Sequence, residues 1–298
     1  MIFFRAERIV GIFMAFSTLW LMPSCKATHG GSGVKIVGGE EVAGAKDRRS
    51  LGATVALYTG TPEEGGTTCT GTLIGPSHVV TAAHCLFEQE HVYLSFGVKQ
   101  RGPNHKLKVT GFASHPKWTP QSSVVYDIGV VTFEGALPPD MKPVALAGAD
   151  DLKTGMDLLL AGYGLSSQTD EKSAGTLRQV TVKTASVDTR RKVLIIATNT
   201  RMGGCNGDSG GPAFIDQQGV LKLVGATHGP SEDMEEVYCD KGHGVWTMVN
   251  RYQGWMKCTF AAKGKPLASL LDDASSADCR APMKMGPRHG RGVGPGVQ

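Results

Sequence analysis

The sequence predicts an all-β protein. Between Leu51 and Val249 the apolar residues recur with a period near two, as in Val92, Leu94 and Phe96. Successive side chains of a strand point to opposite faces of the sheet, so this period is typical of strands. Clusters of Gly, Pro, Ser and Asp separate the runs, and the chain of 298 residues holds 40 glycines. Many short strands joined by turns are therefore expected.

The N-terminus predicts a secretory signal peptide over residues 1–25. Arg5 and Arg8 precede an apolar run from Ile9 to Met22. A bilayer span needs about 20 apolar residues and this run has roughly 14, which favours a cleaved signal over an anchor. The protein is therefore expected to be secreted.

Cys25 ends this signal, at the place where bacterial lipoproteins carry their lipidated cysteine, which suggests a bacterial protein. Methionine and proline depart from the usual box around it, so two outcomes stay open. Either Cys25 is lipidated and attaches the protein to a membrane of the cell envelope, periplasmic or outer-surface, or ordinary cleavage leaves it behind. Residues 26–35 fit a tether in the first case and a propeptide in the second.

Two continuous apolar runs, 128–133 and 158–161, predict strands that are buried on both faces. Gly162-Tyr163-Gly164 predicts a tight turn after the second run. The prolines between 138 and 143 predict a connection near residues 140–155. A helical pattern is expected only at 250–257.

Residues 259–298 form a C-terminal extension, expected to be disordered after Cys279. Its last part, 280–298, holds four basic residues, no acid and eight Gly or Pro residues. Such a segment cannot bury a core. Its four charges equal the formal net charge of +4, so the rest of the chain is nearly neutral and a nucleic-acid partner is not expected.

Three motifs predict covalent acyl transfer by a serine. Gly207-Asp208-Ser209-Gly210-Gly211-Pro212 is typical of a loop that directs a serine hydroxyl outward. A serine at its ordinary pKa is a weak nucleophile and needs a base, which in turn needs an orienting group. His84, in Ala-Ala-His-Cys, and Asp127, at the start of a buried strand, supply them.

These motifs, in the order His84, Asp127, Ser209, resemble the trypsin/chymotrypsin family of serine proteases. Ile36-Val37-Gly38-Gly39 after Lys35 also resembles the family's activated N-terminus. The resemblance covers residues 36–258, the expected protease domain. It implies two six-stranded antiparallel Greek-key barrels with a C-terminal helix, and an active site between them.

The family resemblance also implies disulfides Cys69–Cys85 and Cys205–Cys239. This leaves Cys258 and Cys279 to pair with each other, with Cys25 as the odd cysteine. Disulfides persist outside the cytosol, which agrees with export.

The resemblance assigns further roles around Ser209. The N–H groups of Gly207 and Ser209 form the oxyanion hole. Cleavage at Lys35–Ile36 frees an ammonium group on Ile36, which pairs with Asp208. Because a buried carboxylate without this partner is costly, we expect the precursor to be a weak enzyme that another protease activates.

The expected specificity pocket departs from that of trypsin. Gly203 stands six residues before Ser209, where trypsin-like enzymes have an aspartate, and Gly229 and Gly244 are the expected walls. A neutral slot favours a chymotrypsin- or elastase-like preference. His228 and His243 keep a glutamate preference open, and Asp240 with the acids at 232–236 keeps a basic one open.

Polypeptide substrates and an activating protease are the expected partners, and neither a metal site nor an organic cofactor is expected. The alternative is a non-catalytic homologue that acts as a binding protein. It is disfavoured because the sequence retains the triad residues, the oxyanion positions and the Ile36 and Asp208 pair. A lipase or esterase is excluded by the order of the motifs, since its serine precedes the acid and the histidine.

Overall fold

A computed structural model describes residues 36, 39–61, 65–100, 106–121, 124–167, 169–197, 203–230, 239, 243–279 and 284–285. The predictions for residues 1–35, including Lys35, Cys25 and the signal peptide, lie outside this part of the chain.

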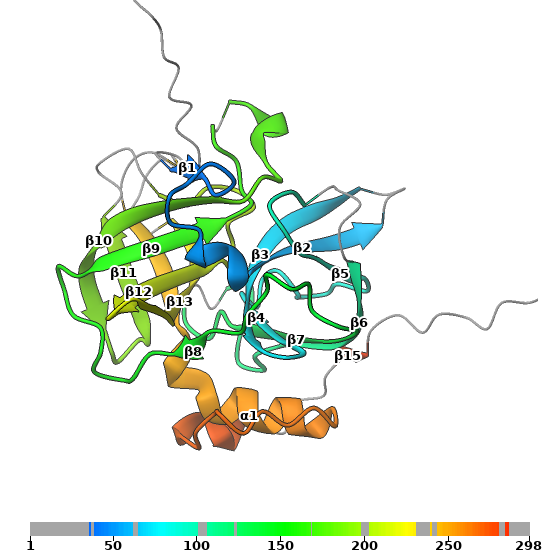
Figure 1. The fold of residues 1–298 in the computed structure, drawn as a ribbon. Helices are drawn as coiled ribbons and strands as arrows, with labels where there is room; N and C mark the ends of the chain where they lie inside the picture. Colours follow the sequence, from blue (N-terminus) through cyan, green and yellow to red (C-terminus); the bar gives the residue numbers. More distant parts are fainter. Residues whose placement is uncertain are drawn as a thin grey trace, which may run out of the picture. The chain divides into compact units, whose positions relative to one another are not determined.

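Six strands of the N-terminal half close into the first barrel (Figure 1). Their spatial order is β6-β5-β2-β3-β4-β7, and β6 also pairs with β7, which completes the circle. The strands are β2 (Thr54–Thr61), β3 (Gly65–Gly75), β4 (His78–Thr81), β5 (Val92–Ser95), β6 (Lys106–Ser114) and β7 (Gly129–Glu134). Because the barrel is closed, each of its six strands pairs with a neighbour on both sides.

The second barrel has the order β10-β11-β14-β13-β12-β9 and closes through β9 and β10. Its strands are β9 (Asp157–Gly162), β10 (Arg178–Asp188), β11 (Val193–Ala197), β12 (Pro212–Gln217), β13 (Val220–Pro230) and β14 (His243–Met248). Short strands lie on its edges: β1 (Glu40–Glu41) pairs with β10, and β8 (Ala145–Leu146) pairs in parallel with β13. The predicted pair of six-stranded antiparallel barrels is confirmed.

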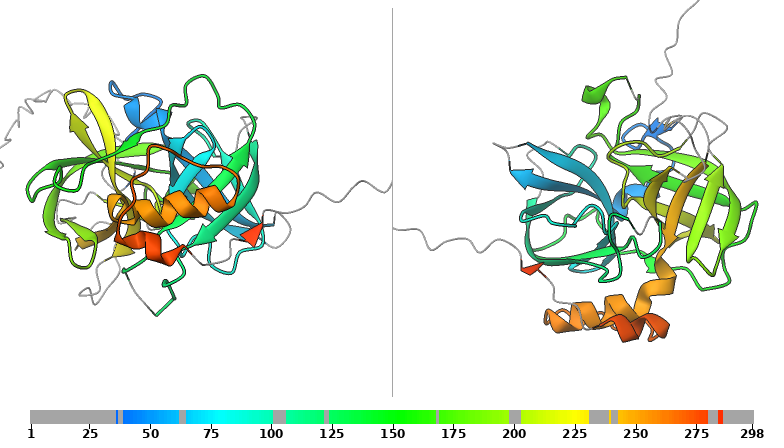
Figure 2. Two further views of the ribbon diagram at one scale, coloured as in Figure 1. Left: turned by 90° about the horizontal axis from the view of Figure 1, so that it is seen from below. Right: turned by 180° about the vertical axis from the view of Figure 1, so that it is seen from behind.

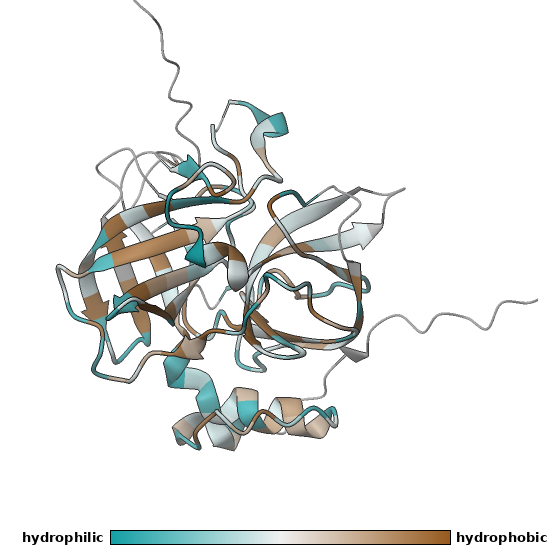
Figure 3. Cartoon of the chain, viewed as in Figure 1, coloured by the Kyte–Doolittle hydropathy of each residue, from teal (hydrophilic) through white to brown (hydrophobic). Residues whose placement is uncertain are grey.

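The hydropathy pattern explains the barrels. Brown apolar stretches follow the strands in Figure 3, and β7 is buried at five successive residues, as its continuous apolar run predicts. β10 alternates instead, with Val180 and Val182 buried and Thr181 and Lys183 exposed. Apolar side chains thus fill both barrel interiors, which is the main favourable contribution to folding.

A helical segment follows the second barrel and packs back on the first. The 3-10 helix η3 (Val249–Tyr252) leads into α1 (Gln253–Ala262), which continues beyond the predicted end at residue 257. Trp255 and Phe260 of α1 join Ile74 and Val130 of the first barrel in one buried cluster. Figure 2 shows α1 beside η4 (Ala274–Asp278).

The extension beyond α1 returns to the first barrel. A disulfide joins Cys258 to Cys279, and Lys117 Nζ lies 2.7 Å from Asp278 Oδ1. Lys284–Met285, inside the stretch for which disorder is expected, form β15 and pair with Phe112 and Gly111 of β6. The remaining residues after Cys279 lie outside the described part of the chain.

Two other short 3-10 helices complete the described elements, η1 (Arg49–Gly52) before β2 and η2 (Glu171–Ser173) before β10. Within the described ranges, no helix combines the length and the apolar character needed to cross a bilayer.

Replacing both Cys258 and Cys279 by serine is expected to lower the free energy of unfolding by about 3 kcal/mol, because the disulfide closes a loop between residues 21 apart and restricts the unfolded chain. Urea denaturation with and without the two substitutions measures this. An unchanged unfolding midpoint would contradict a stabilising role for the extension.

Candidate active site

His84 and Asp127 meet where the first barrel faces the second. Asp127 Oδ1 accepts a hydrogen bond from the backbone N–H of His84 at 2.9 Å, and Oδ2 lies 2.7 Å from His84 Nδ1. The Asp127 side chain has no solvent exposure, whereas that of His84 is 29% exposed. A buried carboxylate thus fixes both the backbone and the ring of a partly exposed histidine.

The chemistry around Asp127 keeps it ionised. Burial alone would raise its pKa, but hydrogen bonds from His228 and His84, and the charges of both imidazoles, outweigh burial and lower the pKa to about 2. Tyr126, just before it, has a φ of 65°, a strained value for a residue with a side chain. Its N–H donates to the hydroxyl of Tyr252 at 3.2 Å, so the second barrel's η3 helps hold this turn.

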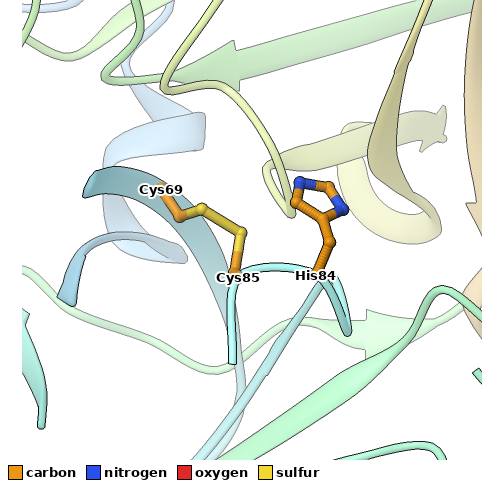
Figure 4. Close-up of side chains that lie close together, drawn as sticks. All are labelled: Cys69, His84 and Cys85. Carbon is orange, nitrogen blue, oxygen red and sulfur yellow. A yellow bond between two sulfur atoms is a disulfide. The ribbon is translucent and has the colours of Figure 1, made fainter. Parts of the chain in front are cut away.

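A disulfide fixes the histidine turn. Cys69 on β3 pairs with Cys85, and Figure 4 shows this bridge and the His84 imidazole rising from neighbouring residues. Ser114 Oγ also donates to the carbonyl of Ala83 at 3.0 Å. The predicted pairs Cys205–Cys239 and Cys258–Cys279 are present as well, so the disulfide predictions are confirmed. Three disulfides fit an extracellular protein.

Two groups of side chains lie close enough to be considered as metal ligands. In the first, Cys69, His84 and Cys85, both sulfurs belong to the disulfide and provide no thiolate. In the second, His84, Asp127 and His228, the nitrogens lie 2.7 and 2.5 Å from one carboxylate oxygen. Two tetrahedral zinc ligands at about 2.1 Å from the metal are separated by roughly 3.4 Å, so these spacings suit shared protons better than a metal.

The serine loop is held against the first barrel. The carbonyl of Ser209 accepts the N–H of Thr70 at 2.8 Å and lies 3.6 Å from Cys85 Sγ, beside His84. Thr70 Oγ1 donates to the carbonyl of Gly207 at 2.8 Å. Gly210 has a φ of 77°, and a Cβ there would lie 2.0 Å from Thr81 Oγ1, so only glycine fits. These contacts bring the partly exposed Ser209 to the histidine turn.

Two N–H groups of this loop have no acceptor. Within the described part of the chain, neither Gly207 N nor Ser209 N donates a hydrogen bond, and Ser209 Oγ makes none either. Unpaired N–H groups beside a nucleophile are the donors that an oxyanion needs. Gly207 has a φ of 98°, a value that favours glycine.

Asp208 points away from this face into the second barrel. It is buried, and its two oxygens accept the N–H groups of Gly164 at 2.8 Å and Cys205 at 2.9 Å. Burial raises its pKa to about 6, although both N–H groups and the charge of Arg178 oppose the rise. Ile36, its predicted partner, is buried in the apolar cluster of the same barrel.

The turn predicted at Gly162-Tyr163-Gly164 makes room for this carboxylate. A Cβ on Gly162 would lie 2.1 Å from Asp208 Oδ1, and one on Gly164 would lie 2.5 Å from Asp208 Cγ. The sequence signalled a turn here, and the structure adds that its glycines enclose Asp208.

The residues expected to form the pocket are uncharged, and the buried ring of Trp246 lies against one of them. Gly203 is buried, a Cβ on Gly229 would meet open space, and a Cβ on Gly244 would lie 2.4 Å from the ring of Trp246. The same ring lies 3.9 Å from the corresponding position on Gly204. Asp240, the acids at 232–236 and the side chain of His243 lie outside the description.

His228 has a different place from the one expected. Its Nδ1 lies 2.5 Å from Asp127 Oδ2, the oxygen that also faces His84 Nδ1. One signal of this lies in the sequence: the segment 225–230 lacks the Ser-Trp-Gly that is usual in the trypsin/chymotrypsin family, which the motifs resemble.

The comparisons agree with this geometry. The family model described as Trypsin matches residues 36–256. A trypsin from Saccharopolyspora erythraea is 32% identical over 208 residues, covering 64% of this chain and 85% of the relative. A chymotrypsin from Phaedon cochleariae is 27% identical and covers 64% and 71%. Glucanase inhibitor protein 2 from Phytophthora sojae is 26% identical and covers 74% and 80%.

Among solved structures, one titled as an HL collagenase aligns with a TM-score of 0.60 at 19% identity, covering 71% of this chain and 94% of that one. At 19% identity, this similarity shows the fold alone. Together with the family match over most of the chain, these similarities show that the protein belongs to the trypsin-like serine protease family.

The two buried carboxylates predict a stability profile with two opposite limbs. Asp127 has a folded pKa near 2, below its ordinary value of 3.8, so the stability it contributes is lost as the pH falls from about 4 to 2. Asp208 has a folded pKa near 6, so its ionisation costs stability as the pH rises from about 4 to 6, by about 3 kcal/mol in all.

Urea denaturation of the uncleaved protein between pH 2 and 7 measures both limbs. Asp208→Asn should remove the decline above about pH 4 and leave the limb below it unchanged. A decline that persists in Asp208→Asn would show that another group causes it.

Proposed function

We propose that the protein is a secreted serine endopeptidase that hydrolyses peptide bonds with His84, Asp127 and Ser209. The observation that carries the proposal is the fully buried Asp127 carboxylate bonded to both the ring and the backbone of His84, in a chain of the trypsin-like family. An aspartate in this position holds the histidine in one tautomer and stabilises its charged form.

In the proposed reaction His84 acts as base and then as acid. Its Nε2 takes the proton of Ser209 Oγ as this oxygen attacks the peptide carbonyl, and Asp127 stabilises the imidazolium. The same proton passes to the departing amine, which leaves an acyl group on Ser209. Water, deprotonated by His84, then attacks the acyl group, and the proton returns to Ser209.

The negative charge that develops on the carbonyl oxygen is proposed to lie at the free N–H groups of Gly207 and Ser209. Loss of one such donor typically costs about 2.7–4 kcal/mol of transition-state stabilisation. The left-handed φ of Gly207 supports this role, because it presents the N–H without a side chain.

We propose that cleavage at Lys35–Ile36 by another protease activates the enzyme. In the described structure Asp208 is buried with two N–H donors and with a pKa raised to about 6 by burial, so a cationic partner would relieve a real cost. The new ammonium group of Ile36 is the proposed partner. Asp208 lies between the two oxyanion positions, so its pairing would order the loop that carries them.

The proposed specificity is chymotrypsin- or elastase-like. The described pocket residues Gly203, Gly229, Gly244 and Trp246 carry no charge, and a neutral, mainly apolar site favours an apolar substrate side chain. His228, which supported a glutamate preference, directs its Nδ1 at Asp127 instead. The basic alternative depends on acids outside the described residues.

A binding protein without catalysis is the second candidate, because one relative is named as a glucanase inhibitor. A fluorophosphonate probe separates the two functions. Labelling of the activated protein at Ser209 supports the protease, and absence of labelling after confirmed cleavage at Lys35–Ile36 favours the binding protein.

The activated protein should cleave a peptide library after Phe, Tyr, Leu or Met, and Ser209→Ala should lower the rate by about 1,000-fold or more, because the nucleophile is lost. Mass spectrometry of the products gives both results. Cleavage that follows basic residues uniformly would overturn the neutral pocket.

Activation should depend on the amine of Ile36. A version of the protein that begins at Ile36 is expected to be active with a free amine and to lose most of its kcat when the amine is acetylated, since the cation that pairs with Asp208 is removed. Equal kcat for both forms would rule out this switch. Purified uncleaved protein that activates itself would contradict the need for another protease.

A further inference from the structure

Two imidazoles share one oxygen of Asp127. His84 Nδ1 lies 2.7 Å and His228 Nδ1 2.5 Å from Asp127 Oδ2, and the two rings meet edge to face at 5.8 Å between centroids. An ionised carboxylate only accepts hydrogen bonds, so both Nδ1 atoms must carry protons. Nε2 is therefore the ring nitrogen at which each imidazole accepts or releases a proton.

The backbone aims His228 at this oxygen. The pairing of β13 with β14 shifts register between Thr227 and Gly229, so His228 is the extra residue of a β-bulge. Bulges redirect a side chain and often occur beside active sites. Thr227 fixes the bulge to the serine loop, because its carbonyl accepts the N–H of Gly210 at 2.7 Å and its N–H donates to Gly211 at 2.9 Å.

We propose that His228 is a positioning residue of the catalytic site: it holds the Asp127 carboxylate with a second Nδ1–H donor, and when its own Nε2 gains a proton it competes with His84 for that carboxylate. The proposal rests on the proposed protease function and adds a residue to its machinery.

The competition follows from charge. Catalysis requires His84 to become an imidazolium beside Asp127. If His228 is already an imidazolium bonded to Asp127, a positive charge on His84 is disfavoured, because one carboxylate then faces two cations. The protonation that lowers activity on the acid side of the pH profile is therefore a property of the two imidazoles together and not of His84 alone.

Other titratable groups around the pair are turned elsewhere. In the described part of the chain, Asp208 on the serine loop faces Gly164 and Cys205, and Lys192, before β11, lies 4.6 Å from the ring centroid of Tyr252. Tyr252, on η3, is affected by the charge of Asp127, and burial raises its pKa, so it stays neutral. The β14 residues opposite the bulge, Val245 and Trp246, are uncharged.

Two substitutions of His228 separate its two roles. Asn places an amide N–H where His has Nδ1–H but does not titrate, whereas Ala removes the donor. In the activated protein His228→Ala should lower kcat/KM about 10- to 100-fold, mainly in kcat, the range expected for a lost hydrogen bond to a charged group. His228→Asn should restore much of this loss.

The pH profile of kcat/KM tests the competition. In His228→Asn the acid limb should move to lower pH, and its limiting slope should fall from two protons toward one, because a single imidazole then shares the Asp127 carboxylate. An acid limb identical to that of the wild type in His228→Asn, with unchanged kcat/KM in His228→Ala, would overturn the proposal.

Proton NMR provides a test that does not need turnover. Two low-field Nδ1–H signals are expected in the wild type and one in His228→Asn and in His228→Ala. If Ser209-dependent cleavage is absent, the protease proposal fails while two low-field signals still support the shared carboxylate. A single low-field signal in the wild type overturns the role of His228, whether or not the protein is a protease.

Discussion

The buried charge of Asp127 is the constraint on which the geometry of the candidate active site depends. A carboxylate with no solvent exposure is tolerated only where donors replace its water, and here the donors come from both barrels. His84 belongs to the turn after β4, and His228 to the bulge of β13. If the barrels moved apart, Asp127 would lose a donor, so satisfying this one charge also keeps the two halves of the site in register.

Asp208 is also a buried aspartate, but its surroundings shift its pKa in the opposite direction. Both carboxylates are buried, but Asp127 faces two groups that can carry positive charge, whereas Asp208 faces two neutral N–H groups and the more distant Arg178. The pKa of the first falls to about 2 and that of the second rises to about 6. The first carboxylate is therefore ionised near neutral pH without a further partner, while the second would gain from a cation, which is the physical basis for the proposed activation.

Local patterns in the sequence predicted the all-β class. The family resemblance of its motifs implied the two barrels, the disulfides Cys69–Cys85 and Cys205–Cys239 and the approach of His84 to Asp127, and the remaining cysteines left Cys258–Cys279. The sequence did not predict His228 at Asp127, because a bulge shifts which face a strand residue occupies, and the bulge follows from pairing between distant strands. Trp246 was missed for a similar reason. Its ring lies against Gly244, two residues earlier on the same strand, and against Gly204 on a separate loop.

The C-terminal extension acts on the same site through aromatic packing. His115 stacks on Tyr126 at 4.9 Å between centroids, and Asp278 of η4 lies 3.5 Å from the His115 ring while pairing with Lys117. Burial lowers the pKa of His115 to about 4, so it is neutral near pH 7 and packs as an apolar ring. Tyr126 directly precedes Asp127 and has a strained φ. The extension, held by Cys258–Cys279, thus contacts the His115 ring that stacks on Tyr126, the strained residue directly before Asp127.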